Sequence, residues 1–157
     1  MSDRALTERQ EAAWRAFALT MQLLDGVLDK QLQRDAGMPH TYFGILAALS
    51  EQPDRTFRMG ELAGCMSFSQ SRLSHAVARM EAAGWVTRRP APDDRRATLA
   101  TLTDQGYAAF TAAAPGHVGC VQHHVFDALT EEQVERLREI CEAILNRLHE
   151  ESESTSE

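Results

Sequence analysis

Residues 67–103 read SFSQSRLSHAVARMEAAGWVTRRPAPDDRRATLATLT, and this stretch divides at its glycine into a helical half and a hairpin half. Apolar side chains recur on one side of a helical wheel in the first half; they are Leu73, Ala76, Val77 and Met80. Ser67 and Gln70 fit a capping box. We therefore expect an amphipathic helix that begins near Ser69 and ends at Gly84, a residue suited to close a helix.

The opposite side of this helix is basic and made mostly of short side chains. Short side chains let a helix enter the major groove of DNA, where arginines can donate to guanine edges or to phosphates. A short helix predicted over residues 59–66 and a tight connection would complete a helix-turn-helix. On this side Ser71, Arg72, His75 and Arg79 would read DNA, and the family resemblance given below adds Ser69, Gln70 and Ser74. Taken alone, this face is also consistent with a solvated surface helix.

The hairpin half predicts two strands around the proline-pinned tip PAPDDR, residues 90–95. Asp94 and Arg96 are two residues apart, so in an extended strand the carboxylate can hold the guanidinium in one orientation. An oriented arginine at a rigid tip suits a narrow minor groove. The other arginines of this wing are left for phosphates: Arg88, Arg89 and Arg95. An exposed ion pair, worth at most about 1 kcal/mol, would explain neither these arginines nor the prolines.

Charge is segregated along the chain. The net charge is −7, but residues 55–96 carry eight arginines against four acidic residues, which gives +4. The remainder carries eight basic and nineteen acidic residues, which gives −11. A basic segment within an acidic chain is typical of a phosphate-facing module on an acidic scaffold.

Long helical segments flank the basic region. Apolar residues recur at steps of three and four from Thr7 to about Arg34, and a buried helix is predicted after Pro39. Another helix runs from Thr103 toward Leu129.

The first and last helices each carry an apolar stripe. The last helix follows a capping box formed by Thr130 and Gln133. The first stripe contains Trp14, Phe17, Met21, Leu24 and Leu28, and the last contains Val134, Leu137, Cys141, Ile144 and Leu148. A monomer of this size would leave one stripe exposed, so we expect a homodimer with two-fold symmetry.

Two patterns in the chain resemble the MarR family of transcription regulators. The first is S-x-S-Q-S-R-L-S-H-x-V-x-R-M-E-x-x-G-W-V at 67–86, and the second is D-R-R-x-x-x-x-x-L-T-x-x-G from Asp94 to Gly106. With the helix PHTYFGILAAL, the resemblance covers about residues 35–110, whereas the terminal helices match only in placement.

The resemblance implies a winged-helix homodimer whose recognition helices enter successive major grooves of a pseudo-palindromic operator in double-stranded DNA. Half-sites would lie about one helical turn, roughly 10 bp, apart. Residues from Ser69 to Arg79 would then read DNA, and Asp94 and Arg96 would form a wing-tip pair. Members commonly repress their own or a neighbouring gene and are released by a small, often aromatic or phenolic, effector.

The fold class expected from these observations is mainly α, with a winged helix-turn-helix domain between long N- and C-terminal helices that form a dimerisation domain. We assign 1–38 to the N-terminal dimerisation helix, 39–103 to the DNA-binding domain, 104–150 to C-terminal dimerisation helices and 151–157 to a disordered acidic tail. No stretch approaches the roughly 20 apolar residues of a membrane span. The charged N-terminus and three scattered cysteines indicate a soluble cytoplasmic protein without a membrane partner.

An effector pocket is predicted where the first helix and the start of the second converge. Its candidate residues are Trp14, Phe17, His40, Tyr42 and Phe43. These side chains would alternatively pack in the core or at the dimer interface, although the polar tips of His40 and Tyr42 require partners if buried.

No cofactor or metal is expected, although His117, Cys120 and His124 share a helical face and could ligate zinc. Oxidant-sensing relatives use a cysteine near the start of the first helix, and the first cysteine here is Cys65.

The motifs of common enzymes are absent: there is no nucleophile elbow, HExxH or phosphate-cradling glycine loop. We therefore do not expect an enzyme. The alternative to ligand-released DNA binding is a winged-helix dimer that acts through a protein partner or a metal or redox signal.

Overall fold

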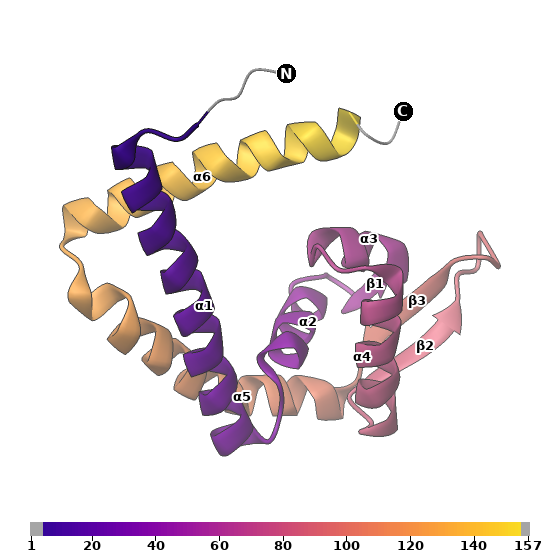
Figure 1. The fold of residues 1–157 in the computed structure, drawn as a ribbon. Helices are drawn as coiled ribbons and strands as arrows, with labels where there is room; N and C mark the ends of the chain where they lie inside the picture. The colour runs from indigo at the N-terminus through magenta and orange to yellow at the C-terminus, as the bar shows by residue number, and fades with distance from the viewer. Residues whose placement is uncertain (1–4, 155–157) are drawn as a thin grey trace. The chain divides into compact units, whose positions relative to one another are not determined.

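The computed structural model describes residues 5–154, and it describes side chains as far as residue 151. The chain is mainly helical with one small antiparallel sheet, which confirms the predicted fold class (Figure 1). The elements in order are α1 (Glu8–Ala36), α2 (His40–Ser50), β1 (Thr56–Arg58), α3 (Met59–Cys65), α4 (Gln70–Ala82), β2 (Val86–Pro90), β3 (Thr98–Leu102), α5 (Asp104–His124), the 3₁₀ helix η1 (Phe126–Ala128) and α6 (Glu131–Ser154).

The described residues form two compact units, one extending to Val118 and the other beginning at Gly119. The first unit therefore contains α1 and most of α5 together with the helix-turn-helix and the sheet. These units do not coincide with the predicted segments 1–38, 39–103 and 104–150.

The sheet has three strands in the order β1-β3-β2, with both pairs antiparallel. Strands β2 and β3 form the predicted hairpin, with Val86 opposite Leu102 and Pro90 opposite Thr98. The pairing of β1 with β3 places Arg58 opposite Leu99, so β1 lies along the side of β3 that does not face β2. In Figure 1 the loop between β2 and β3 projects away from the helices.

One hydrophobic core brings together α2, α3, α4, the sheet, the end of α1 and part of α5. The largest fully buried side chains are Leu32, Met38, Ile45, Leu46, Leu49, Leu62, Leu73, Val77, Met80 and Val86. The whole predicted apolar side of α4 lies in this core. Burial of that side fixes which face of α4 points outward.

The helix ends follow the predicted signals with one correction. Thr7 and Gln10 form a capping box at α1, and Gly84 adopts the left-handed conformation, with φ 79°, after α4. The predicted capping box at Ser67 is wrong, because Ser67 has a φ of 52° and an N-cap requires extended backbone. Ser69 is the N-cap instead, and its side chain accepts a hydrogen bond from the backbone N–H of Arg72.

The second unit contains the end of α5, η1 and α6. The predicted capping box at α6 is present, since the N–H of Gln133 donates to Thr130 Oγ1 and the N–H of Thr130 donates to Gln133 Oε1. Helix α6 continues to Ser154, so residues 151–154 are helical where a disordered tail was predicted, and 155–157 lie outside the described residues. Among residues 5–154, no helix is both long and apolar enough to cross a membrane.

Candidate nucleic-acid interface

Helix α4 presents the polar face that the sequence predicts. All seven residues proposed to read DNA are exposed, whereas Leu73, Val77 and Met80 are fully buried. Because α4 is anchored by its apolar side, its short polar side chains and its two arginines face outward. The connection to α3 is tight, since the backbone N–H of Phe68 donates to the carbonyl of Ala63 at 2.9 Å.

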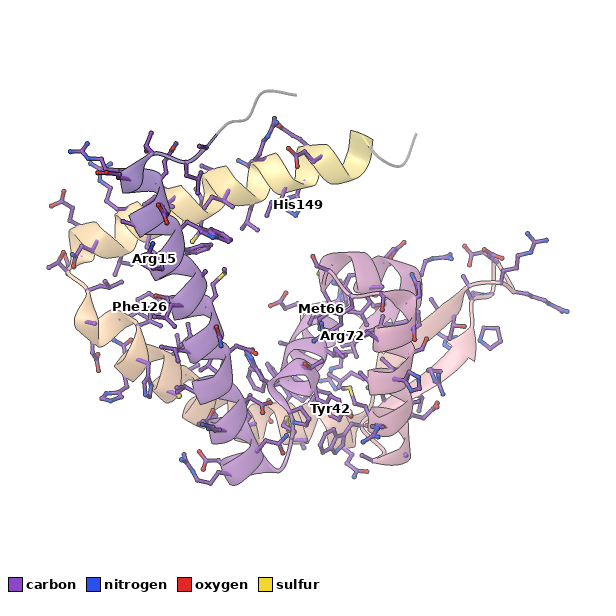
Figure 2. All side chains as sticks on the ribbon, viewed as in Figure 1. Arg15, Tyr42, Met66, Arg72, Phe126 and His149 are labelled. Carbon is purple, nitrogen blue, oxygen red and sulfur yellow. The ribbon has the colours of Figure 1, made fainter. Side chains whose placement is uncertain are left out.

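Arg72 is the arginine nearest to this turn, and its guanidinium stacks on the Phe68 ring with 4.0 Å between Cζ and the ring centroid. A planar guanidinium over an aromatic face is an attractive contact. Arg72 is therefore held at the N-terminal end of α4 while its donor groups stay available. Figure 2 labels Arg72 on this helix.

The tip of the hairpin is a turn in which both Asp94 and Arg96 lie outside the strands. The backbone N–H of Arg96 donates to Asp94 Oδ1 at 2.9 Å, and that of Ala97 donates to the carbonyl of Asp94 at 2.9 Å. The predicted carboxylate–guanidinium pair is therefore wrong: no ion pair joins Asp94 to Arg96 in the part of the chain that the structure describes. The turn places Asp94 against the Arg96 backbone, so the carboxylate shapes the loop and leaves the guanidinium free.

Arg88 at the start of the hairpin is bound to Glu81 in the last turn of α4. Its backbone N–H donates to Glu81 Oε1 at 3.0 Å, and its Nε and Nη2 donate to Oε2 at 2.9 and 2.7 Å. The hydrogen bond from Arg88 is the main reason why the pKa of Glu81 lies below its usual value. Arg88 was predicted to contact phosphate, and the structure shows that part of its guanidinium is already engaged.

Two further arginines of the basic segment have carboxylate partners. Arg58 at the end of β1 bonds to Asp93 in the wing loop. Arg55 lies 3.2 Å from Asp104 and over the ring of Tyr107. The sequence did not single out Arg58, because its contact with Asp93 depends on strand pairing and has no local pattern.

The remaining five arginines of the segment have no carboxylate within 4.0 Å among the described residues, and all of them are exposed. They are Arg72, Arg79, Arg89, Arg95 and Arg96. In Figure 2 nitrogen-bearing side chains extend outward from the loop at the end of the hairpin.

A groove of about 500 Å³ lies between α4 and the hairpin. Three arginines line it, and Gln70 and Ser74 face it from α4. The three arginines are Arg58, Arg88 and Arg96. These cationic and neutral donors suit phosphate oxygens, and the carboxylate of Glu61 lines the same groove.

The junction of the wing with α4 and α5 is closed by Thr103. Its Oγ1 donates to the carbonyl of Gly84 at 2.7 Å, and its backbone N–H donates to the carbonyl of Trp85 at 3.0 Å. The N–H of Gly106 in α5 donates in turn to Thr103 Oγ1 at 3.0 Å. The residues that follow α4 and the end of the hairpin therefore meet at Thr103.

The predicted effector residues form two separate groups, with Trp14 and Phe17 on α1 and His40, Tyr42 and Phe43 at the start of α2. Trp14 and Phe17 are exposed on α1, with ring centroids 6.4 Å apart. His40 Nδ1 lies 3.0 Å from Asp25, and Asp25 is eleven residues, or about 16 Å of helix, beyond Trp14. The remaining two belong to the core and its edge: Phe43 is buried, and half-buried Tyr42 packs against it.

Of the three predicted metal ligands, Cys120 and His124 contact each other, whereas His117 Nδ1 is buried without a hydrogen-bond partner among the described residues. The His117 ring lies 4.3 Å from that of Phe43, and burial, with a smaller effect of His40, lowers the pKa of His117. His124 Nδ1 lies 2.9 Å from the carbonyl of Cys120. Among the described residues, no group of three potential ligands is placed to hold a metal ion.

Comparisons with known proteins agree with this geometry. A family model described as the MarR family matches residues 36–97. The crystal structure of Sco3205, a MarR family transcriptional regulator from Streptomyces coelicolor in complex with DNA, is 49% identical, with a TM-score of 0.88 over 92% of this chain and 91% of that chain. AbsC, from the same organism and family, is 36% identical, with a TM-score of 0.86 over 93% and 98% of the two chains.

A curated relative is the transcriptional repressor MprA of Escherichia coli K12, which is 27% identical over 112 residues. The match takes in 71% of this chain and spans 63% of the length of MprA. These proteins are transcription regulators and not enzymes, which agrees with the absence of catalytic motifs from the sequence. A relative with 49% identity over nine-tenths of both chains, together with the winged helix-turn-helix described above, shows that this chain belongs to the MarR family of transcriptional regulators.

Proposed function

We propose that this protein is a homodimeric repressor that binds a pseudo-palindromic operator in double-stranded DNA and is released by a small ligand. The observation that carries the proposal is the set of five exposed arginines without carboxylate partners, all on α4 and the hairpin. Guanidinium groups that no described carboxylate neutralises are available to phosphates and base edges. The structure of the similar Sco3205 in complex with DNA supports the same role.

The two elements divide the reading of the duplex. The short outward side chains of α4 let it enter the major groove, where Arg72, Arg79 and Gln70 can reach base edges. Arg96 at the wing tip suits a narrow minor groove. Arg88 contributes less than an unpaired arginine, because only its Nη1 has no partner among the described residues.

Dimerisation is supported by the apolar side chains that a single chain leaves exposed on its first and last helices. On α6 these are Leu137, Ile140, Ile144, Leu145 and Leu148. On α1, Trp14, Phe17 and Met21 share one side of the helix, and Leu19 and Leu23 lie on the other. Contiguous exposed apolar side chains mark interaction surfaces. A second copy of the chain is the occupant that a palindromic operator requires.

Repression is proposed because the relative MprA is named a transcriptional repressor. Release by a ligand is proposed at the dimer surface of α1, where Trp14 and Phe17, exposed in a single chain, could contact an aromatic molecule beside the second copy. His40, Tyr42 and Phe43 are already engaged with neighbouring side chains. Titrating phenolic compounds against the protein–DNA complex tests this part; a broad panel without any release would remove it.

The DNA-binding proposal is tested by selecting duplexes from a random-sequence library and measuring affinity over a salt series. Log affinity should fall linearly with log salt, with a slope of about −0.9 for each phosphate contacted. The selected sequences should contain two inverted half-sites about 10 bp apart. No binding at low ionic strength, or a slope near zero, would contradict the proposal and favour a protein partner.

A further inference from the structure

The four carboxylates within the basic segment occupy informative positions. Each adds negative charge to a surface that is proposed to approach phosphates, so each on its own weakens binding. Yet Glu81, Asp93 and Asp94 all accept hydrogen bonds from within the segment. Glu61 is the exception, since its Oε1 only approaches Arg58 Nε at 4.0 Å.

Two of these carboxylates join the wing to other elements. Asp93 in the wing loop bonds to Arg58 at the end of β1, 35 residues away in the chain. Glu81 in α4 binds the backbone and the guanidinium of Arg88 in β2. The hairpin is thus held near its tip by one ion pair and at its base by the other.

A two-stranded hairpin is only marginally stable by itself. Beyond Pro90 and Thr98, one backbone hydrogen bond joins the two arms of the loop, from the N–H of Ala91 to the carbonyl of Ala97 at 2.9 Å. In the described part of the chain, β3 pairs with β2 and with the three-residue strand β1. An arginine at the tip can meet the minor groove only if the tip keeps its distance from α4 in the major groove. Side chains that fix such a distance are as necessary as those that touch the ligand.

We propose that Arg58, through Asp93, and Glu81, through Arg88, are positioning residues that hold the wing at a fixed distance from the recognition helix and so determine operator specificity. This inference rests on the proposed DNA-binding function. Asp93 and Glu81 repel phosphate, but by holding the wing in position they contribute to specificity, and this contribution offsets the repulsion. Arg58, which lines the groove together with Arg88 and Arg96, then acts by holding the wing loop.

The test compares single and compensating substitutions on a duplex selected by the unchanged protein. Each variant is titrated with that duplex and with a copy whose flanks are replaced by G·C pairs. The ratio of the two affinities reports whether the wing still reads the minor groove. If the unchanged protein selects no duplex, the proposed function fails; if it does and the variants keep its ratio, only the positioning role fails.

Asp93→Asn separates positioning from simple charge. Removal of one negative charge strengthens binding to every duplex through electrostatics alone, and leaves the ratio unchanged. If the wing loses its position, the ratio of the two affinities should fall. The fall should be about fivefold or more, which corresponds to the loss of one typical base-pair preference in the flank. Glu61→Gln is the matched control, because Glu61 also faces Arg58, at 4.0 Å, and its substitution removes the same charge without breaking a hydrogen bond. An Asp93→Asn ratio equal to that of Glu61→Gln would overturn the proposal for Arg58.

Reversal of the pair provides the rescue. Arg58→Asp should lower the ratio, and Arg58→Asp combined with Asp93→Arg, which restores an opposite-charge pair and the net charge, should return the ratio to within about twofold of the original. A double variant no better than Arg58→Asp would show that Arg58 itself contacts DNA, which overturns the positioning role. Glu81→Gln should also lower the ratio, as Asp93→Asn does. An unchanged ratio would show that Glu81 does not position the wing.

Melting temperatures complete the experiment. Both ion pairs are substantially exposed, so these variants should melt within a few degrees, roughly 2–4 °C, of the unchanged protein. A lower ratio with an unchanged melting temperature supports positioning. A ratio that falls only in step with the melting temperature across the variants would assign these residues to folding and contradict the inference.

Discussion

Replacing Gly106 with alanine would place a methyl group against the backbone where the wing meets α5. The new β-carbon would overlap the carbonyl oxygen of Trp85 and lie 2.8 Å from both the carbonyl carbon of Trp85 and Leu102 Cδ1. Optimal carbon–carbon contacts are about 3.5–4.0 Å, so the neighbours must move by about 1 Å. Overpacking costs about 1–3 kcal/mol, and the upper end applies because the Trp85 carbonyl also accepts the hydrogen bond from Thr103.

We therefore expect Gly106→Ala to lose about 3 kcal/mol of the free energy of unfolding, which lowers the melting temperature by about 6–12 °C for a chain of this size. Gly64→Ala is the control, because it also lies in a helix and its β-carbon would meet nothing within 4 Å. That variant should gain about 0.5–1 kcal/mol. Thermal unfolding by circular dichroism at one fixed protein concentration compares them, since a dimer's melting temperature depends on concentration. If Gly106→Ala melts with the unchanged protein, the junction is not rigidly packed and the reasoning is refuted.

Three other predictions address charge, pH and assembly. Arg89→Ala and Arg95→Ala should each reduce the slope of log affinity against log salt by about 1; anisotropy titrations over a salt series measure this, and an unchanged slope would exclude the residue from phosphate contact. Burial and the charge of His40 lower the pKa of His117 below 6.5. As the pH falls, His117 is therefore protonated in the unfolded chain before it is protonated in the folded protein. The free energy of unfolding should fall as the pH drops below about 6.5, until the folded His117 is also protonated. His117→Phe should show a smaller loss when urea unfolding is compared between about pH 7.5 and 5.5, and an equal loss would assign it to other groups. Ile144→Glu should produce monomers in sedimentation velocity and weaken operator binding, whereas a stable dimer would exclude α6 from the interface.

The elements that local sequence determines were predicted well. The apolar side of α4, its end at Gly84 and the capping box at Thr130 depend on residues within one or two turns of each other. The hairpin and its tip were also placed correctly, because the prolines of PAPDDR mark the turn between its two strands. The capping box at Ser67 failed because a tight turn to α3 imposes a left-handed conformation there.

The partners of the charged side chains could not be predicted in the same way. Arg88 and Arg89 are neighbours with the same chemistry, yet only Arg88 faces Glu81, because alternate residues of a strand point to opposite sides. Arg58 meets Asp93 only once β1 has paired with β3. Trp14 seemed close to His40 in the order of helices, but the rise of α1 separates them.

The stacking of Arg72 on Phe68 has a consequence for the energetics of recognition. An arginine that becomes fixed only on binding loses up to about 1.5–2 kcal/mol of rotamer entropy at that moment. Here the Phe68 ring holds the guanidinium of Arg72 in the folded protein before DNA binds. The loss of rotamer entropy therefore occurs on folding and not on binding. A lysine in its place would lack the planar group that stacks on the Phe68 ring, so the duplex would have to order more of its side chain.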